Sequence, residues 1–520
     1  MRSLALIALV FGGCIESQEN NPFGEGLLQG EPAFLHGGEA WPVVSTDDWL
    51  QPEPDRIFYV AQGGDDSAFG GSDEPWADLQ TSLCKLRAGD RLVVRSGSYQ
   101  GPFFIDDDCP NVNPGRFIEV VGEPGAKIVG GPSPSARGFW KPVLTINRAG
   151  WTVRGFQIDG SPSAGVPVQV LAGGQRTVLR DLVLIGAGSA GLTIGPLATE
   201  VSARNLVIRN GVGTDTGVSH GVVILGGCRQ VNLTANFIHH NSGDGIHILG
   251  GHIVPSELGI VQGMSATEGL VVEGNKIHAN QGHGVVVGHS VGTHVKANTI
   301  WNVRPSTVGE GIAIEVHDGA QDAAIERNLV VEATEGVSIG AGERPEALAE
   351  GARAPQSVLV ERNMISNPLS PSRHGISVDT AVSVRIYHNA VHRSRRALMI
   401  SDLPPKTQSL RVLNNLFLEA VELGFRTSGM AVFDRFEFNA FGLGGSAVES
   451  EVGEARQSIT SQVEAGAISE TFVVGAASFT DDNLDQPNGV QVVDKGTSIP
   501  GFGFEGTAPD LGPVEHVAAN

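Results

Sequence analysis

Residues 357–363 read Ser-Val-Leu-Val-Glu-Arg-Asn, and this alternation of apolar and polar residues, ending in asparagine, recurs along the second half of the chain. A second short run follows the asparagine, as in Asn275-Lys276-Ile277-His278. A third run begins with glycine nine residues after Asn275, as Gly284-Val285-Val286-Val287. Alternation with period two, rich in β-branched residues and without helical spacing, predicts three short β-strands in each repeat.

The asparagines are spaced as in a solenoid. Their shortest steps are 23, 24, 26 and 26 residues, and the longer steps fit the same unit with an inserted loop. An asparagine tolerates the left-handed backbone of a sharp bend, and its amide can donate and accept along a stack of identical neighbours. A leucine-rich repeat also has a periodic asparagine, but these coils lack its leucine-rich strand and its helix. The series is Asn205, Asn236, Asn275, Asn298, Asn328, Asn363, Asn389, Asn415 and Asn439, extended upstream by Asp181 and Gly155.

These patterns predict an all-β solenoid, a parallel β-helix over residues 116–440 with its asparagines stacked at one bend. An open solenoid exposes core and strand edges, so its ends need caps. Residues 51–115 are expected to form the N-terminal cap, and residues 441–520 lose the repeat and are expected to close the other end. A capping helix is predicted between Pro75 and Gly89, because four apolar residues share one helical face: Trp76, Leu79, Leu83 and Leu86.

The chain resembles the right-handed parallel β-helix repeat proteins of the pectate lyase-like superfamily. The repeated Asn-x-Ile/Val turns and Gly-Ile/Val-x-Ile/Val strands from 155 to 439 carry the resemblance. It is reinforced by shorter segments at both ends: Phe58–Asp66, Pro75–Gln80, Gly89–Val94, Gly97–Tyr99 and Pro509–Glu515. The resemblance implies a right-handed, single-stranded parallel β-helix, and it specifies the fold far better than the activity.

Residues 1–14 are identified as similar to a bacterial lipoprotein signal peptide. Arg2 precedes an apolar run from Leu4 to Phe11, and two glycines lead to Cys14, the expected lipidation site. The run is too short to span a bilayer as a mature helix. Residues 15–50 are expected to be a flexible tether. The sequence therefore predicts a membrane-anchored protein of the bacterial cell envelope, in the outer membrane or outside the cell. An ordinary secretory signal with an incidental cysteine is the alternative.

Composition agrees with an exported solenoid. A chain of 520 residues exceeds a usual compact domain, but a solenoid grows lengthwise as a monomer without a thicker core. The net charge of −22 argues against nucleic acid as a partner and leaves room for a local basic groove that binds a polyanionic glycan. Cys84 and Cys109 are candidates for a disulfide in the cap, and Cys228 is expected to be a small core residue.

Polar residues recur on the glycine-led strands. Ten of the fifteen histidines fall between His220 and His317. Outward positions on or just after these strands add His247, Glu315 and His317, with Asp318 adjoining. The position before the strand glycine is expected to form a ladder of His220, Asp244, His283, Glu310, Glu335 and His374.

Imidazoles and carboxylates along a groove suit two tasks. One is abstraction of the proton alpha to a uronate carboxylate, which needs a base and a cation, here Arg304 or Arg344, to neutralise the carboxylate. The other is Ca²⁺ binding by Asp244, Glu310, Glu315 and Asp318. A solvated polar strand face without catalysis is the plainer alternative for any single histidine. The candidate catalytic residues are His317, Glu315, Asp318, His247, His283 and Glu310.

Glu315-Val316-His317-Asp318 is similar to the Asp-Pro-His-Asp/Glu strand motif of mannuronan C5-epimerases. His317 and Asp318 match that motif, whereas Glu315 and Val316 stand where it has Asp and Pro. The resemblance makes His317 a candidate base and Asp318 its helper. The function expected is action on an acidic polysaccharide by a uronate lyase or a C5-epimerase. Two alternatives remain open, a glycan-binding or adhesive surface lipoprotein and a glycoside hydrolase with a suitably spaced carboxylate pair.

Overall fold

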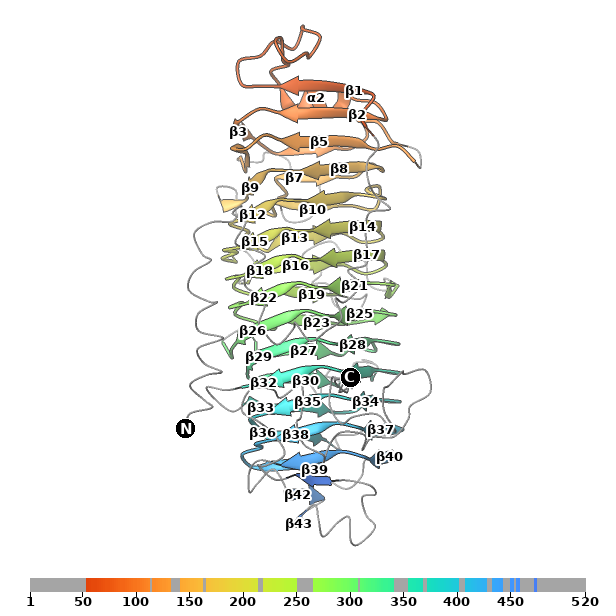
Figure 1. The fold of residues 1–520 in the computed structure, drawn as a ribbon. Helices are drawn as coiled ribbons and strands as arrows, with labels where there is room; N and C mark the ends of the chain where they lie inside the picture. Colours follow the sequence, from red (N-terminus) through yellow and green to blue (C-terminus); the bar gives the residue numbers. More distant parts are fainter. Residues whose placement is uncertain are drawn as a thin grey trace, which may run out of the picture. The chain divides into compact units, whose positions relative to one another are not determined.

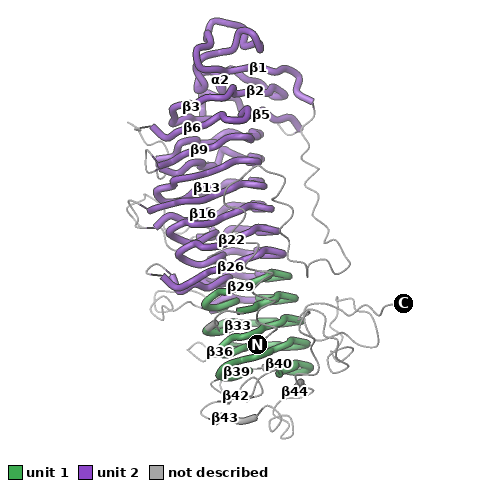
Figure 2. Tube along the Cα trace, turned by 60° about the vertical axis from the view of Figure 1, so that its left-hand side comes forward, with its two compact units in different colours: residues 1–50, 325–339, 357–520 green, residues 51–324, 340–356 purple. Residues whose placement is uncertain are grey.

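The computed structural model describes residues 53–442 and three later strands. Gaps within the first range lie at 113–114, 132–140, 162–164, 214–217, 250–264, 307–308, 341–353, 368–371, 402–406 and 428–432, and the later strands cover 449–452, 455–458 and 472–474. Cys14, the expected tether and Arg344 lie outside the described residues. The chain divides into two units, coloured in Figure 2: residues 51–324 with 340–356, and residues 1–50 with 325–339 and 357–520. We call them the N-terminal and C-terminal units.

Three sheets of parallel strands build the N-terminal unit, and each turn of the chain adds one strand to each sheet (Figure 1). Sheet A contains β1 (Arg56–Val60), β2 (Asp90–Val94), β5 (Ile118–Gly122), β8 (Trp151–Arg154), β11 (Val178–Arg180), β14 (Thr199–Arg204), β17 (Arg229–Thr234), β21 (Val271–Glu273) and β25 (His294–Lys296), with β20 (Thr267–Glu268) and β24 (Ser290–Val291) beside them. Sheet B contains β3 (Gly97–Gln100), β6 (Ala126–Val129), β9 (Gln157–Asp159), β12 (Val183–Ile185), β15 (Val207–Arg209), β18 (Phe237–His239), β22 (Lys276–His278) and β26 (Thr299–Val303). Sheet C contains β4 (Phe103–Ile105), β7 (Leu144–Ile146), β10 (Val168–Val170), β13 (Ala190–Ile194), β16 (His220–Ile224), β19 (Ile246–Ile248), β23 (Val285–Val287) and β27 (Ile312–Val316).

The C-terminal unit repeats this arrangement. The division between the units falls within the residues of β28 (Ala324–Glu326), after Ala324. One sheet contains β31 (Leu359–Glu361), β34 (Arg385–Tyr387), β37 (Leu410–Leu413) and β40 (Phe433–Glu437). The next contains β29 (Leu329–Ala333), β32 (Met364–Ser366), β35 (Ala390–His392), β38 (Leu416–Leu418), β41 (Ala440–Gly442) and β44 (Phe472–Val474). The third contains β30 (Glu335–Ile339), β33 (Ser372–Val378), β36 (Ser394–Ile400), β39 (Leu423–Thr427), β42 (Glu449–Val452) and β43 (Ala455–Ser458), of which the last two pair antiparallel.

The fold is therefore an all-β parallel β-helix, as the repeat predicts, and it has the right-handed form that the resemblance implies. Its interior is built by alternation: in β19, Ile246 and Ile248 are fully buried, whereas His247 between them points outward. Burial of such a side chain stabilises the fold by about 1.5–3 kcal/mol. Strands β2, β3 and β4 already pair with later coils, so the parallel sheets include part of the segment for which the sequence predicts a cap.

The predicted capping helix exists but is shorter than expected. Helix α2 spans Leu79–Lys85, and Asp78 caps it by accepting a hydrogen bond from the amide of Thr81 at 2.6 Å. Pro75 and Trp76 precede the helix, because Trp76 pairs with Val60 in a β-bridge. Leu86 is extended and ends the helix before Gly89. The four apolar residues are all buried as predicted, but only Leu79 and Leu83 belong to the helix.

The cysteines follow the expectations from the sequence. Cys84 of α2 is joined by a disulfide to Cys109, with Cα atoms 4.2 Å apart. Cys228 is a free, buried thiol whose Sγ lies 2.8 Å from the carbonyl oxygen of Gly195. Burial raises the pKa of Cys228 to about 12, which agrees with a small core residue. Among the described residues, no helix has the length and apolar character needed to span a membrane.

The asparagine ladder is present in both units. In the C-terminal unit, the Asn389 amide nitrogen donates to Oδ1 of Asn415 at 3.0 Å, and its own Oδ1 accepts from the amide nitrogen of Asn363 at 3.0 Å. Asn236, Asn275 and Asn298 are joined in the same way in the N-terminal unit. These asparagines are essentially unexposed, so each ladder supplies its own buried donors and acceptors.

Two details of the ladder differ from the prediction. The residue in the left-handed region is the one before the asparagine, for example Ala235 (φ 53°), Gly274 (φ 63°) and Ala297 (φ 52°). Asn205 (φ 53°) occupies that preceding position itself and bonds to Asp181, whereas Leu206 lies in register with Asn236. The placement of Asn205 in the ladder is therefore wrong. A shift of one residue is hidden in the sequence because Leu206, Val207 and Ile208 are all apolar.

Candidate functional site

Sheet C of the N-terminal unit brings together most of the predicted polar residues. Glycines precede its strands because the coils approach closely there. A Cβ on Gly221 would lie 2.5 Å from the carbonyl oxygen of Gly245, and one on Gly245 would lie 2.6 Å from that of Gly284. The residues before these glycines, His220, Asp244 and His283, consequently lie on successive coils.

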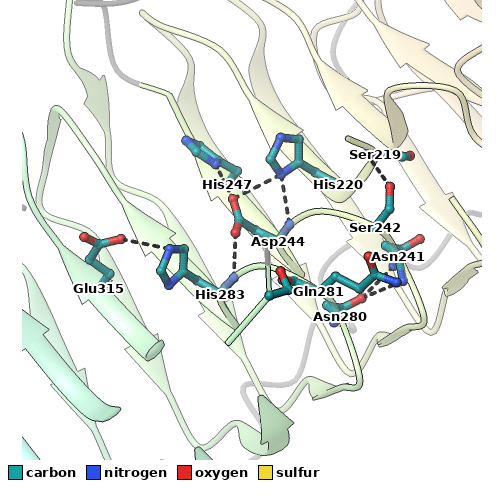
Figure 3. Close-up of polar contacts among 11 residues, drawn as sticks. Ser219, His220, Asn241, Ser242, Asp244, His247, Asn280, Gln281, His283 and Glu315 are labelled. Carbon is teal, nitrogen blue, oxygen red and sulfur yellow. Dashed lines mark hydrogen bonds and ion pairs between the residues drawn. The ribbon is translucent and has the colours of Figure 1, made fainter. Parts of the chain in front are cut away.

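Asp244 is the centre of this group (Figure 3). Its Oδ2 lies 2.6 Å from Nδ1 of His247 and 3.1 Å from Nδ1 of His220. Its Oδ1 accepts a hydrogen bond from the backbone amide of His283 at 2.6 Å. Asp244 is 5% exposed, so nearly all of the solvation of its carboxylate is replaced by these contacts. Burial alone would raise the pKa of Asp244, but the hydrogen bonds and charges of His220 and His247 hold that pKa well below its usual value.

The contact with Asp244 assigns the ring proton of His247. An ionised carboxylate only accepts hydrogen bonds, so His247 donates to it from Nδ1, which leaves the lone pair on Nε2. Nδ1 of His220 is shared between the carboxylate of Asp244 and the backbone amide of Asp244 at 3.0 Å. Burial lowers the pKa of His247 despite the opposing effect of Asp244. His247 is therefore neutral at neutral pH and has the tautomer of a base.

The pKa of His317, which directly follows β27 of the same sheet, is displaced in the opposite direction. Its Nδ1 lies 2.9 Å from Oδ2 of Asp318. Burial would lower the pKa of His317, but the hydrogen bond to Asp318 and the negative charges of Glu315, Asp318 and Asp244 together raise it. The charge of His317 in turn lowers the pKa of His247. One face of the sheet thus holds two histidines whose pKa values are displaced in opposite directions, as a base and an acid require.

Glu315 lies at the edge of this group. Its Oε2 is 3.8 Å from Nε2 of His283, whose Nδ1 accepts from the backbone amide of Ile312 at 3.3 Å. Glu315 aligns with Val286, which aligns with His247, so Glu315 and His247 share one outward column two coils apart, about 10 Å. The outward projection predicted for Glu315 and His247 is thus observed.

The predicted ladder is correct in part. His220, Asp244 and His283 follow one another, but Ile312 and not Glu310 lies next to His283. The alternating pattern is unchanged by a shift of two residues, so the sequence could not reveal this register. In the C-terminal unit Glu335 and His374 are in register, and Glu335 accepts a hydrogen bond from the Ser377 hydroxyl. Burial and nearby arginines lower the pKa of His374 to about 3.

The metal ligands predicted for Ca²⁺ do not form a group among the described residues. Two other clusters have ligand atoms within 4.8 Å of one another: His220 with Asp244 and His247, and His239 with His240 and His278. Both contain imidazoles, which calcium does not favour. Arg304, one of the two predicted cations, is exposed and donates to Oδ1 of Asn302 at 2.8 Å.

Sequence reasoning identified the members of the Asp244 group but not their bonding. His220, Asp244 and His247 come from two coils, and their contacts depend on the exact register of β16 and β19. The sequence does not predict the cluster of His239, His240 and His278. Its one signal is a histidine pair placed just before Asn241, which itself bonds to Asn280 in a second asparagine ladder at 2.9 Å.

Comparisons with known proteins agree with the fold. Residues 198–349 match the family model described as "Right handed beta helix region". No curated protein matches the sequence of the chain.

The solved structures to which the chain is similar are distant in sequence. A pectate lyase, Pel9A, is 13% identical with a TM-score of 0.43, and the match covers 89% of this chain and 97% of that chain. The surface adhesin PfbA of Streptococcus pneumoniae is 9% identical with a TM-score of 0.48, covering 73% of this chain and 89% of that one. The A-module of the mannuronan C-5 epimerase AlgE6 of Azotobacter vinelandii is 15% identical with a TM-score of 0.43, covering 63% of this chain and 92% of that one. At these identities and TM-scores the likeness says nothing of the activity, and the parallel sheets together with the family model over residues 198–349 identify the fold as a right-handed parallel β-helix.

Proposed function

We propose that the chain acts on a uronate-containing polysaccharide by proton transfer at the carbon next to the carboxylate. The observation that carries this proposal is the contact of His247 with the buried carboxylate of Asp244 on sheet C, with His317, whose pKa is raised, directly after β27 of the same sheet. Removal of such a proton needs a base, and either elimination or epimerisation then needs a proton donor. Displaced pKa values of this kind are frequent among the residues of catalytic sites.

His247 is assigned as the base, which revises the role that the sequence resemblance gives to His317. Asp244 orients His247 and stabilises the imidazolium that forms when Nε2 accepts the substrate proton. His317, held by Asp318, is the donor. In a lyase it protonates the leaving glycosidic oxygen, and in an epimerase it returns a proton to the opposite face of the same carbon. The carbanion formed at that carbon is stabilised by the positive charge of His317.

Export belongs to the same proposal. A polysaccharide of this kind lies outside the cytoplasm, which agrees with a lipid anchor at Cys14 and with the disulfide between Cys84 and Cys109. The anchor would hold the catalytic face of sheet C at the cell envelope.

The test uses alginate, pectate and glycosaminoglycans as substrates, each with and without Ca²⁺. Ultraviolet absorbance of unsaturated products indicates a lyase, and solvent-proton exchange at C5 without chain cleavage indicates an epimerase. His247→Gln and His317→Gln should each lower the rate about 10²- to 10⁴-fold. His294→Gln is the control, because His294 is exposed on β25 of sheet A, away from this face. Binding without turnover on every polymer would exclude the proposal and favour the adhesive alternative.

A further inference from the structure

A second histidine cluster lies on sheet B, separate from the proposed catalytic face. His239 of β18 is in register with His278 of β22, which is in register with Trp301 of β26. The rings of His239 and His278 are stacked with centroids 5.0 Å apart, and those of His278 and Trp301 with centroids 4.3 Å apart. His239 and His278 are each less than a tenth exposed. Packing between coils therefore fixes two imidazoles one above the other.

His240 adds a third imidazole because of its backbone. In a regular strand the side chains of His239 and His240 would point to opposite faces. His240 is in the left-handed region (φ 55°), and this bend turns its ring back beside its neighbour. The Nδ1 atoms of His239 and His240 are 2.7 Å apart. The rings of His240 and His278 meet edge to face, with centroids 5.4 Å apart.

A hydrogen bond between His239 and His240 does not account for all of these contacts. One hydrogen bond between neutral rings explains the distance from His239 to His240, but it does not require His278. A ligand atom of each of the three rings lies within 4.8 Å of the other two. Two nitrogens bound to one tetrahedral zinc ion lie about 3.3 Å apart, given zinc–nitrogen distances of about 2.0–2.1 Å. Because His240 is exposed, its ring would turn on metal binding to open the pair to that separation.

We propose that His239, His240 and His278 bind one divalent transition metal ion such as Zn²⁺, Cu²⁺ or Ni²⁺. Three imidazoles suit these ions and not Ca²⁺ or Mg²⁺, which prefer oxygen ligands. The two buried rings are stacked nearly parallel, with 9° between their planes, so one of them must turn to aim its nitrogen at the ion, and the exposed His240 closes the site from solvent. Arg209 is in register with His239, and its positive charge makes the site weaker than a structural zinc site. A fourth position is left for water or an external ligand.

The ion would join two successive coils through His239 and His278. It is independent of the proposed polysaccharide chemistry, since that chemistry uses residues of sheet C. The metal should therefore raise the melting temperature of the protein without being needed for turnover.

The experiment is titration of the purified full chain with ZnCl₂ by calorimetry, with Co²⁺ spectra as a second reading of tetrahedral nitrogen coordination. The expected result is one ion per chain and a zinc-dependent rise in melting temperature. His240→Ala should weaken binding at least tenfold and abolish that rise. Alanine is suited to this position, because Ala279 occupies the equivalent bend of the next coil with φ 50°.

Two further variants separate this site from the rest of the chain. His294→Ala removes an exposed histidine of sheet A and should leave binding unchanged. His220→Ala removes a member of the other cluster and should also leave it unchanged. Absence of stoichiometric binding by the wild-type protein would overturn the proposal. Full binding of zinc by His240→Ala would also overturn the proposal, and so would loss of zinc binding in His220→Ala.

Discussion

Nδ1 of His247 lies 2.6 Å from Oδ2 of Asp244, a carboxylate buried between two coils and contacted by a second histidine. This contact determines which nitrogen of His247 is free to act as a base. An asparagine at position 244 would present an amide N–H to His247 and favour the other tautomer, with the proton on Nε2.

Asp244→Asn should therefore lower turnover of the responsive polysaccharide about 10²- to 10⁴-fold while the fold is retained. Initial rates, circular dichroism and the melting temperature measure these effects. Asp434→Asn is the matched control, because Asp434 is exposed on β40 of the C-terminal unit. A variant with asparagine at 244 that turns over at the wild-type rate would remove His247 from the role of base.

The pH dependence of turnover should be bell-shaped around neutral pH. The base must be deprotonated, so the rate falls on the acidic side as pH drops through the pKa of His247, which burial lowers below 6.5. The acid must be protonated, so the rate falls on the basic side as pH rises through the pKa of His317, which lies above 6.5. A profile of kcat/KM against pH measures both limbs.

His317→Gln supplies the control for that profile. The residual activity of this variant should lose the basic limb and keep the acidic one, which should move to higher pH because the charge of His317 no longer lowers the pKa of His247. If both limbs persist in the variant, the proton donor is a different group.

Membrane attachment should depend on Cys14. The charged residue, apolar run and small residues before this cysteine motivate the prediction, and a diacylated thiol supplies enough apolar surface for stable attachment. Cys14→Ser should move the protein from the membrane fraction to the soluble fraction of cells that express the full chain. Equal partition of wild-type and variant chains would show that Cys14 is not the anchor.

The repeating parts of the fold could be predicted from the sequence because they depend on local alternation. Gly245, His247 and the apolar residues around them indicate a strand and its outward face without any knowledge of its neighbours. The register between coils, meaning which residues of successive coils lie side by side, does not follow from local alternation. The errors at Asn205 and Glu310 are shifts of one and two residues that leave the apolar pattern intact.

The candidate site was predictable as a list of residues but not as an arrangement. The bond from His247 to Asp244 and the elevated pKa of His317 arise from contacts between coils and from burial. The His239, His240 and His278 cluster depends on one left-handed residue, which periodicity cannot indicate. Sequence reasoning therefore located the face of sheet C and missed the cluster on sheet B.

The asparagine ladder should contribute strongly to stability, and Asn389 is the residue to test. Its side chain is fully buried and donates to the Val360 carbonyl at 2.9 Å and to Asn415 at 3.0 Å. Asn389→Ala leaves the backbone N–H of Asn363 without its acceptor and removes one of the two hydrogen bonds of the Asn363 side-chain amide, which keeps the Ile325 carbonyl. Each unsatisfied buried group costs about 1–3 kcal/mol, so the variant should be destabilised by at least about 2 kcal/mol.

Urea unfolding followed by circular dichroism measures the loss. Asn205→Gly is the matched control, because Asn205 lies outside the ladder and glycine accepts its left-handed backbone. We expect the control to change stability by less than about 0.5 kcal/mol. Equal effects of the two substitutions would mean that the ladder is an ordinary turn contact. A large effect at Asn389 alone would establish that buried amide stacking, and not the bend itself, is the reason asparagine recurs in every later coil.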